Sequence, residues 1–215
     1  MSVLERLASS VGRRDEEPNR DVARQIVAGQ DQAGVLELVA ALDTRDSNLR
    51  SDALKALYEV GALDPFLIAP HTQRFVALLG ERSNRMVWGA MMALAAVASQ
   101  QADELFPQRN AVLKAMASGS VITVDAGVRA LAGIASARDE YRTALVPELL
   151  RHLKTCRPKD VPQHSEAILP AVNAPHAAEF VAVLEKRLPN LTGSQAARVR
   201  KVMRRAQATR GTRTA

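Results

Sequence analysis

Apolar residues recur along this chain at spacings of three and four positions. In the clearest segment they are Leu49, Ala53, Ala56, Leu57 and Val60. An α-helix turns once in about 3.6 residues, so this spacing places all five side chains on one face. Small residues recur one turn before larger ones, which lets neighbouring helices approach closely. The pattern predicts amphipathic helices, each of which buries one stripe.

The helical pattern repeats with a period of 37 residues. The clearest nine-residue copies begin at Asp52, Gly89 and Ala126. A fourth copy begins at His164, and a weaker fifth copy begins at Arg198. Several copies in one register are typical of a helical solenoid, in which each unit packs only against its neighbours.

Upstream of each later copy we expect another helix, which carries a proline and forms a pair with the copy. Pro70, Pro107, Pro147 and Pro175 each precede an apolar run. Proline fits the first turn of a helix or bends its interior, so each proline marks a helix start or a bend. We expect about ten to twelve antiparallel helices and no β-sheet.

These paired helices resemble the HEAT-repeat family, within the wider class of armadillo-like superhelices. In that family a unit is a helical hairpin whose first helix is often bent at a proline. The resemblance covers residues 31–208 and implies an all-α fold, a right-handed α-solenoid of about five hairpins. Residues 1–29 would add an N-terminal hairpin, so that residues 1–208 form a single domain, and residues 209–215 a flexible basic tail. The family's Asp and basic pair before the second helix is matched well only by Asp46 and Leu49-Arg50, which weakens assignment to a particular HEAT subfamily.

Composition fits closely packed helices and excludes several other classes. Of the 215 residues, 47% are hydrophobic but only 3% are aromatic, so small aliphatic side chains dominate the core. The longest apolar run, residues 86–98, is shorter than the roughly 20 residues that span a bilayer. We find no secretion leader, and Cys156 is alone, so no intrachain disulfide is possible. We therefore expect a cytoplasmic protein without a membrane segment.

Positive charge is concentrated at the C-terminal end. Nine of the 29 basic residues lie from Lys186 onward, where no acidic residue occurs. Residues 1–185 contain the other 20 basic residues and all 23 acidic ones, so they carry a net charge of −3. One interpretation is a solvated final helix with a frayed tail. The other is weak, sequence-independent binding of nucleic acid or another polyanion, since no aromatic side chain after Phe180 could stack on bases. The candidate polyanion-binding residues are Arg198, Lys201, Arg204 and Arg205.

The second helices of such a solenoid build a concave face that binds partners. On this face we expect Trp88 and Met92 as apolar anchors, with Lys55, Asp125 and Arg129 as polar contacts. The helix that carries Trp88 is apolar on all sides, which in a surface helix requires a covering partner. The alternative is that Trp88 belongs to the ordinary core.

Two functions fit this face. The preferred one is a non-enzymatic scaffold that binds a protein partner and needs no cofactor. The alternative follows from the resemblance, because some HEAT-like proteins are alkylpurine DNA glycosylases whose concave face carries tryptophans, an Asp and basic residues. Trp88, Asp125 and Arg129 match that set in part, but the chain has only one Trp.

Metal binding is considered at one place. His152 and Cys156 lie four residues apart, on one face of a helix, and His164 is near in sequence. A zinc site needs three or four ligands, and no other Cys is present. We therefore expect no metal site and interpret the pair as a coincidence on the surface.

Overall fold

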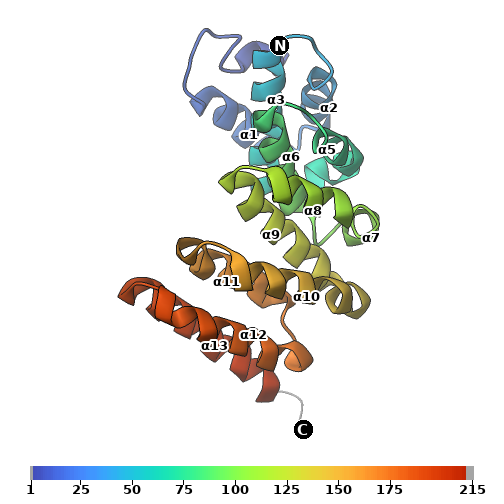
Figure 1. The fold of residues 1–215 in the computed structure, drawn as a ribbon. Coiled ribbons are helices and arrows are strands. Elements are labelled where there is room, and N and C mark those ends of the chain that lie inside the picture. Colours follow the sequence, from blue (N-terminus) through green and yellow to red (C-terminus); the bar gives the residue numbers. More distant parts are fainter. Residues whose placement is uncertain (1, 212–215) are drawn as a thin grey trace. The chain divides into compact units, whose positions relative to one another are not determined.

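The structure is a computed structural model that describes residues 2–211. Within this range every regular element is a helix and no strand occurs (Figure 1), which confirms the all-α solenoid expected from the sequence. Contacts divide the chain into two compact units, Met1–Gly127 and Val128–Ala215, and each is described by itself. The single domain expected over residues 1–208 stays a prediction.

The first unit is a layered stack of helices. Helix α3 packs against α1 and α6, α2 packs against α3, and α5 packs against α6. The elements of this unit are η1 (Leu4–Arg6), α1 (Glu17–Gly29), α2 (Gln32–Ala41), α3 (Ser47–Leu63), α4 (Pro65–Ile68), η2 (Ala69–His71), α5 (Thr72–Leu78), α6 (Asn84–Val97), α7 (Ala102–Leu105), α8 (Arg109–Ser118) and the start of α9 (Val121–Ala137).

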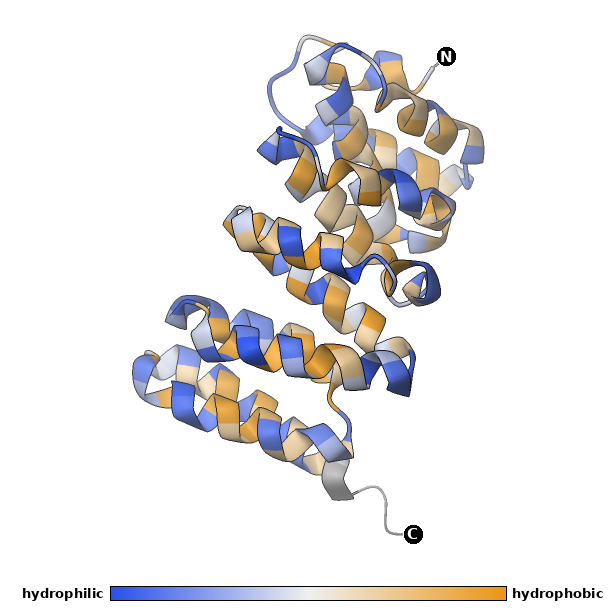
Figure 2. Ribbon diagram, turned by 45° about the vertical axis from the view of Figure 1, so that its right-hand side comes forward, coloured by the Kyte–Doolittle hydropathy of each residue, from blue (hydrophilic) through white to orange (hydrophobic). Residues whose placement is uncertain are grey.

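The second unit repeats this arrangement. Helix α10 packs against α11 and α12, and α13 packs against the same two helices. Hydrophobic and hydrophilic residues alternate along its helices in Figure 2, as expected where one face is buried. The elements after α9 are α10 (Asp139–Thr155), η3 (Pro158–Asp160), α11 (Val161–Ile168), η4 (Leu169–Ala171), α12 (Ala174–Arg187), η5 (Leu188–Asn190) and α13 (Gly193–Gly211).

The repeat found in the sequence corresponds to these helices. Its five copies lie in α3, α6, α9, α11 with η4, and α13. Of the predicted stripe, Ala53, Ala56, Leu57 and Val60 are fully buried and Leu49, at its start, is half-buried. The fourth copy is shorter, because Pro170 lies in η4 and has no N–H with which to continue α11.

The prolines have the predicted positions at starts and bends. Pro70 lies in η2, between α4 and α5, and Pro107 lies between α7 and α8. Pro147 is inside α10, and Pro175 is in the first turn of α12. The first helices of the repeats are therefore bent or started by proline, as the sequence indicates.

The N-terminal hairpin is smaller than expected, because its first helix is only the single turn η1. Instead of continuing as helix, the backbone N–H groups of Ala8 and Ser9 donate to side chains. Ala8 N–H donates to Asn19 Oδ1 at 2.9 Å, and Ser9 N–H donates to Asp52 Oδ2 at 2.8 Å. Asn19 Nδ2 also donates to Asp52 Oδ1 at 2.9 Å, so this buried network fastens the N-terminal loop to α1 and α3.

None of the helices described is both long enough and apolar enough to cross a membrane.

Candidate partner-binding surface

A half-buried apolar patch lies on α6, in the first unit. Trp88 and Met92 are both half-buried, as are Ala95 and Ala96, one turn further along. Next to Trp88, α6 lies close to α3, since a Cβ atom on Gly89 would come within 2.7 Å of Leu54 Cδ2 and 3.8 Å of Tyr58 Cδ1. A larger residue at position 89 would force Leu54 to move, so glycine lets these two second helices lie close together.

The close approach pairs two aromatic rings. The centroids of Trp88 and Tyr58 lie 5.8 Å apart and the ring planes are inclined by 59°, a favourable tilted arrangement. Tyr58 is buried and packs against the indole, while Trp88 as a residue is only half-buried. Trp88 is thus neither a core residue nor a fully exposed one. We call the accessible surface of α3, α6 and the start of α9 around Trp88 the second-helix surface.

Lys55 does not face solvent as the sequence predicted, because only 5% of it is exposed. Its Nζ lies 2.6 Å from Glu59 Oε1 and 2.9 Å from Glu16 Oε2, and 4.7 Å from the centroid of the Tyr58 ring. Glu16 immediately precedes α1, which packs on α3. The correction therefore has a tertiary cause: α1 covers a position that the periodicity of α3 alone leaves open.

Electrostatics keep Lys55 charged. Burial alone lowers its pKa, but hydrogen bonds with Glu59, Tyr58 and Glu16 outweigh that effect and raise the pKa well above its usual value. Burial raises the pKa of the Tyr58 phenol, which therefore remains neutral at physiological pH. The ammonium thus acts as a fixed positive charge beside the Tyr58 ring.

A charged border surrounds this cluster. Arg20 Nε lies 3.7 Å from Glu59, and Arg85 lies 3.5 Å from Glu16. Arg85 is on α6, three residues before Trp88, so the border adjoins the apolar patch. The pair Glu16-Glu17 is typical of a helix start, but no sequence pattern indicates that Glu16 contacts Lys55, because Glu16 and α1 lie outside the 37-residue pattern. Beyond the border is an open, mostly polar hollow of about 350 Å³, lined by Ala8, Ser9, Arg13, Arg14, Asp15, Glu16, Asn48, Asp52 and Arg85.

The two remaining candidates lie on α9. Asp125 is half-buried and belongs to the first unit, with Trp88 and Met92. Arg129 is exposed and belongs to the second unit. The structure thus describes Lys55, Trp88, Met92 and Asp125 within one compact body, and Arg129 with the other. Partner binding by these five residues stays a prediction.

The basic C-terminal helix has the amphipathic form expected. Val199, Val202, Met203 and Ala206 are buried, and Lys201, Arg204 and Arg205 are exposed. Helix α13 extends to Gly211, so the predicted tail lies partly in this helix and partly, at residues 212–215, outside the described residues.

Arg198 is engaged within the second unit. Its Nε and Nη2 donate to the two carboxylate oxygens of Glu166 at 3.0 and 2.7 Å. This bidentate pair lowers the pKa of Glu166 and partly compensates the charge of Arg198. Polyanion binding through α13 stays a prediction.

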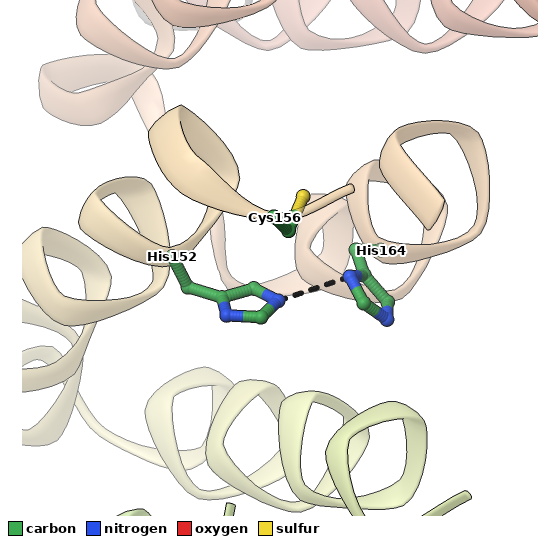
Figure 3. Close-up of side chains that lie close together, drawn as sticks. All are labelled: His152, Cys156 and His164. Carbon is green, nitrogen blue, oxygen red and sulfur yellow. Dashed lines mark hydrogen bonds between the residues drawn. The ribbon is translucent and has the colours of Figure 1, made fainter. Parts of the chain in front are cut away.

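The structure brings His164 close to His152 and Cys156, the two residues considered for metal binding. His152 Nε2 lies 3.0 Å from His164 Nδ1, and Cys156 lies beside both (Figure 3). The sequence placed only His152 and Cys156 on one helical face. The turn η3 and helix α11 bring His164 back to them.

Comparison with known proteins identifies the fold. No family model matches the chain, and no curated protein matches it. An engineered protein matches with 21% identity and a TM-score of 0.68, over 97% of this chain and 98% of that one. A designed armadillo repeat protein in complex with the peptide (KR)4 matches with 20% identity and a TM-score of 0.68, over 97% and 98%. Kap121p matches with 15% identity and a TM-score of 0.65, over 96% of this chain and 23% of its own.

Proposed function

The chain is a helical repeat protein of the armadillo/HEAT type, and from this premise we propose that it is a non-enzymatic module that binds a segment of a partner protein. The binding site is the second-helix surface of the first unit. The single observation that carries this proposal is the half-buried Trp88, supported by Tyr58 and continued by Met92 along α6.

The chemistry of the patch suits a protein ligand. Trp and Met are enriched at protein interfaces, and a partly accessible indole on a rigid support loses little conformational entropy on binding. The partner would place an apolar side chain against Trp88 and Met92. The charged border of Arg20, Arg85 and Glu16 would then surround that contact, as a polar rim surrounds the core of an interface.

The solved structures support binding by this fold. One of them is a designed armadillo repeat protein in complex with the peptide (KR)4, which supports peptide binding as a function of this kind of repeat. Its own sequence is only 20% identical, so the residues that contact a ligand in this chain must be argued from this chain alone. Trp88 is the strongest of them, because it is the single tryptophan and lies on a second helix.

A displayed peptide library, together with co-purification from the source cells, would supply a ligand for measurement. Trp88→Ala is expected to weaken its binding by about 2 kcal/mol or more, which is roughly thirtyfold in the dissociation constant. Phe66→Ala is the matched control, because Phe66 is 69% exposed but lies on α4, outside the second helices. Equal binding by wild type and a folded Trp88→Ala protein, or an equal loss in the Phe66 control, would refute the proposed site.

The rival function is excision of alkylated bases from DNA. It is favoured by Asp125, a half-buried carboxylate in the same unit as Trp88. Purified protein is incubated with alkylated DNA and the released bases are counted. Release by wild type that disappears in Asp125→Asn would replace the binding proposal with an enzymatic one.

A further inference from the structure

The second unit holds a compact group of three metal-ligating side chains. His152, Cys156 and His164 each offer one ligand atom, and these three atoms all lie within 4.8 Å of one another. The imidazole rings approach with His152 Nε2 and His164 Nδ1 3.0 Å apart, joined by the dashed line in Figure 3. His164 is almost completely buried, and the other two residues are half-buried.

Local structure holds this group in place. Cys156 ends α10, where its N–H donates to the carbonyl of His152 at 2.8 Å. The backbone is extended at Cys156, then turns through η3 and enters α11, which carries His164. One ligand therefore comes from the last turn of α10, the second from the residue that follows this helix and the third from α11.

The spacing matches a tetrahedral metal centre. With Zn–N bonds of about 2.0–2.1 Å and a Zn–S bond of about 2.3 Å, two nitrogens bound to one zinc are about 3.3 Å apart, and nitrogen and sulfur about 3.6 Å. The imidazole nitrogens are already near that separation. The sulfur of Cys156 points away from them in Figure 3 and lies 3.8 Å from the carbonyl of Leu153, a weak thiol contact. Metal binding therefore requires this side chain to rotate about its Cα–Cβ bond toward the two rings.

We propose that His152, Cys156 and His164 bind one Zn²⁺ ion, with water at the fourth position. Two imidazoles and one thiolate suit zinc, whereas Mg²⁺ and Ca²⁺ require oxygen ligands. The site lies at the C-terminal end of α10, where the helix dipole favours positive charge. This proposal concerns the second unit and does not depend on partner binding by the first.

Two positively charged side chains, Arg187 and Arg157, lie near the proposed site. Burial raises the pKa of the Cys156 thiol and the nearby Arg187 opposes that effect, so a metal must displace the thiol proton when it binds. Arg187 donates to the carbonyls of Lys154 and Cys156, each at 2.5 Å. Arg157 is paired with Asp160 at 2.6 Å. Both guanidinium groups are thus held by oxygen acceptors.

Zinc bound here would connect α10 to α11 and stabilise the native state. At a zinc concentration one hundred times the dissociation constant, linkage predicts an increase in melting temperature of roughly 5–10 °C. Mg²⁺ at the same concentration should leave the melting temperature unchanged. A plain hydrogen bond between the two histidines, without metal, would give no such difference.

The test uses the full chain without an affinity tag, stripped with a chelator and titrated with Co²⁺ and then Zn²⁺. We expect one equivalent of Co²⁺, a thiolate-to-cobalt charge-transfer band, and displacement of that band by Zn²⁺. Cys156→Ser should abolish the band, and His152→Ala should weaken Zn²⁺ binding at least about tenfold. His71→Ala is the matched control, because His71 is half-buried in the first unit.

Because His164 is buried, its replacement could unfold the unit, so the decisive variants are those of the half-buried His152 and Cys156. Far-ultraviolet circular dichroism checks that both variants keep the helical content of wild type. The proposal is overturned if wild type binds no Zn²⁺, or if folded Cys156→Ser and His152→Ala proteins bind it as tightly as wild type does.

Discussion

Replacement of Asn19 by alanine tests how the N-terminal loop is attached to the first unit. Asn19 is fully buried and makes two hydrogen bonds through its carboxamide. The oxygen accepts from Ala8 N–H at 2.9 Å, and the nitrogen donates to Asp52 Oδ1 at 2.9 Å. Asn19→Ala removes both bonds, while Ser9 N–H keeps its bond to Asp52.

The expected loss follows from the two groups left behind. A buried N–H without an acceptor costs about 1–3 kcal/mol, and a hydrogen bond to a charged group contributes about 1.5–3 kcal/mol. Water that enters the space left by the carboxamide satisfies part of this loss. We therefore expect Asn19→Ala to lower the free energy of unfolding of the first unit by about 3 kcal/mol.

Two measurements check this prediction. Urea denaturation gives the change in stability, and hydrogen exchange should show faster exchange at the amides of Ala8 and Ser9 than in wild type. Asn48→Ala is the control, because Asn48 lies on α3 and is exposed. A loss below about 0.5 kcal/mol, with both amides still protected, would show that the network does not hold the loop.

Two further predictions concern charge. Glu166→Gln removes the carboxylate partner of Arg198, so the affinity for DNA at low salt should rise and the slope of log affinity against log salt should steepen by about one. Unchanged DNA binding in a filter assay would contradict a role for α13. The raised pKa of Lys55 means that the stability from its ion pairs is present below its ordinary pKa of about 10.4 and is lost as pH rises through the higher folded-state pKa. The test compares Tyr58→Phe, which removes the phenol titration, with the double variant Tyr58→Phe/Lys55→Met. The double variant should lose less stability above about pH 10.4 in alkaline denaturation curves, and equal losses in the two proteins would count against this reasoning.

The helices and their buried stripes could be predicted from the sequence alone. The stripe of α3 and the apolar side of α13, from Val199 to Ala206, are both buried as the spacing indicates. Helical periodicity is a local property, and burial of one face follows wherever that face is apolar. The 37-residue repeat also predicted that the helices pack in pairs, because each repeat must bury its apolar face against the next repeat.

The candidate sites depended on contacts that no local pattern contains. Glu16 covers Lys55 across 39 positions of sequence, and Trp88 meets Tyr58 across 30. Similarly, η3 and α11 return His164 to His152 and Cys156, a juxtaposition set by the direction of two helices and not by the spacing of the residues.

The sequence by itself therefore determined most of the helices, the apolar stripe that each one buries and that the chain is a solenoid. The tertiary structure decided which polar side chains remain accessible and which are brought together. The physical reason is that periodicity constrains one helix at a time. Which neighbouring element covers a position decides the exposure of Lys55, the pairing of Arg198 with Glu166 and the meeting of the three proposed metal ligands.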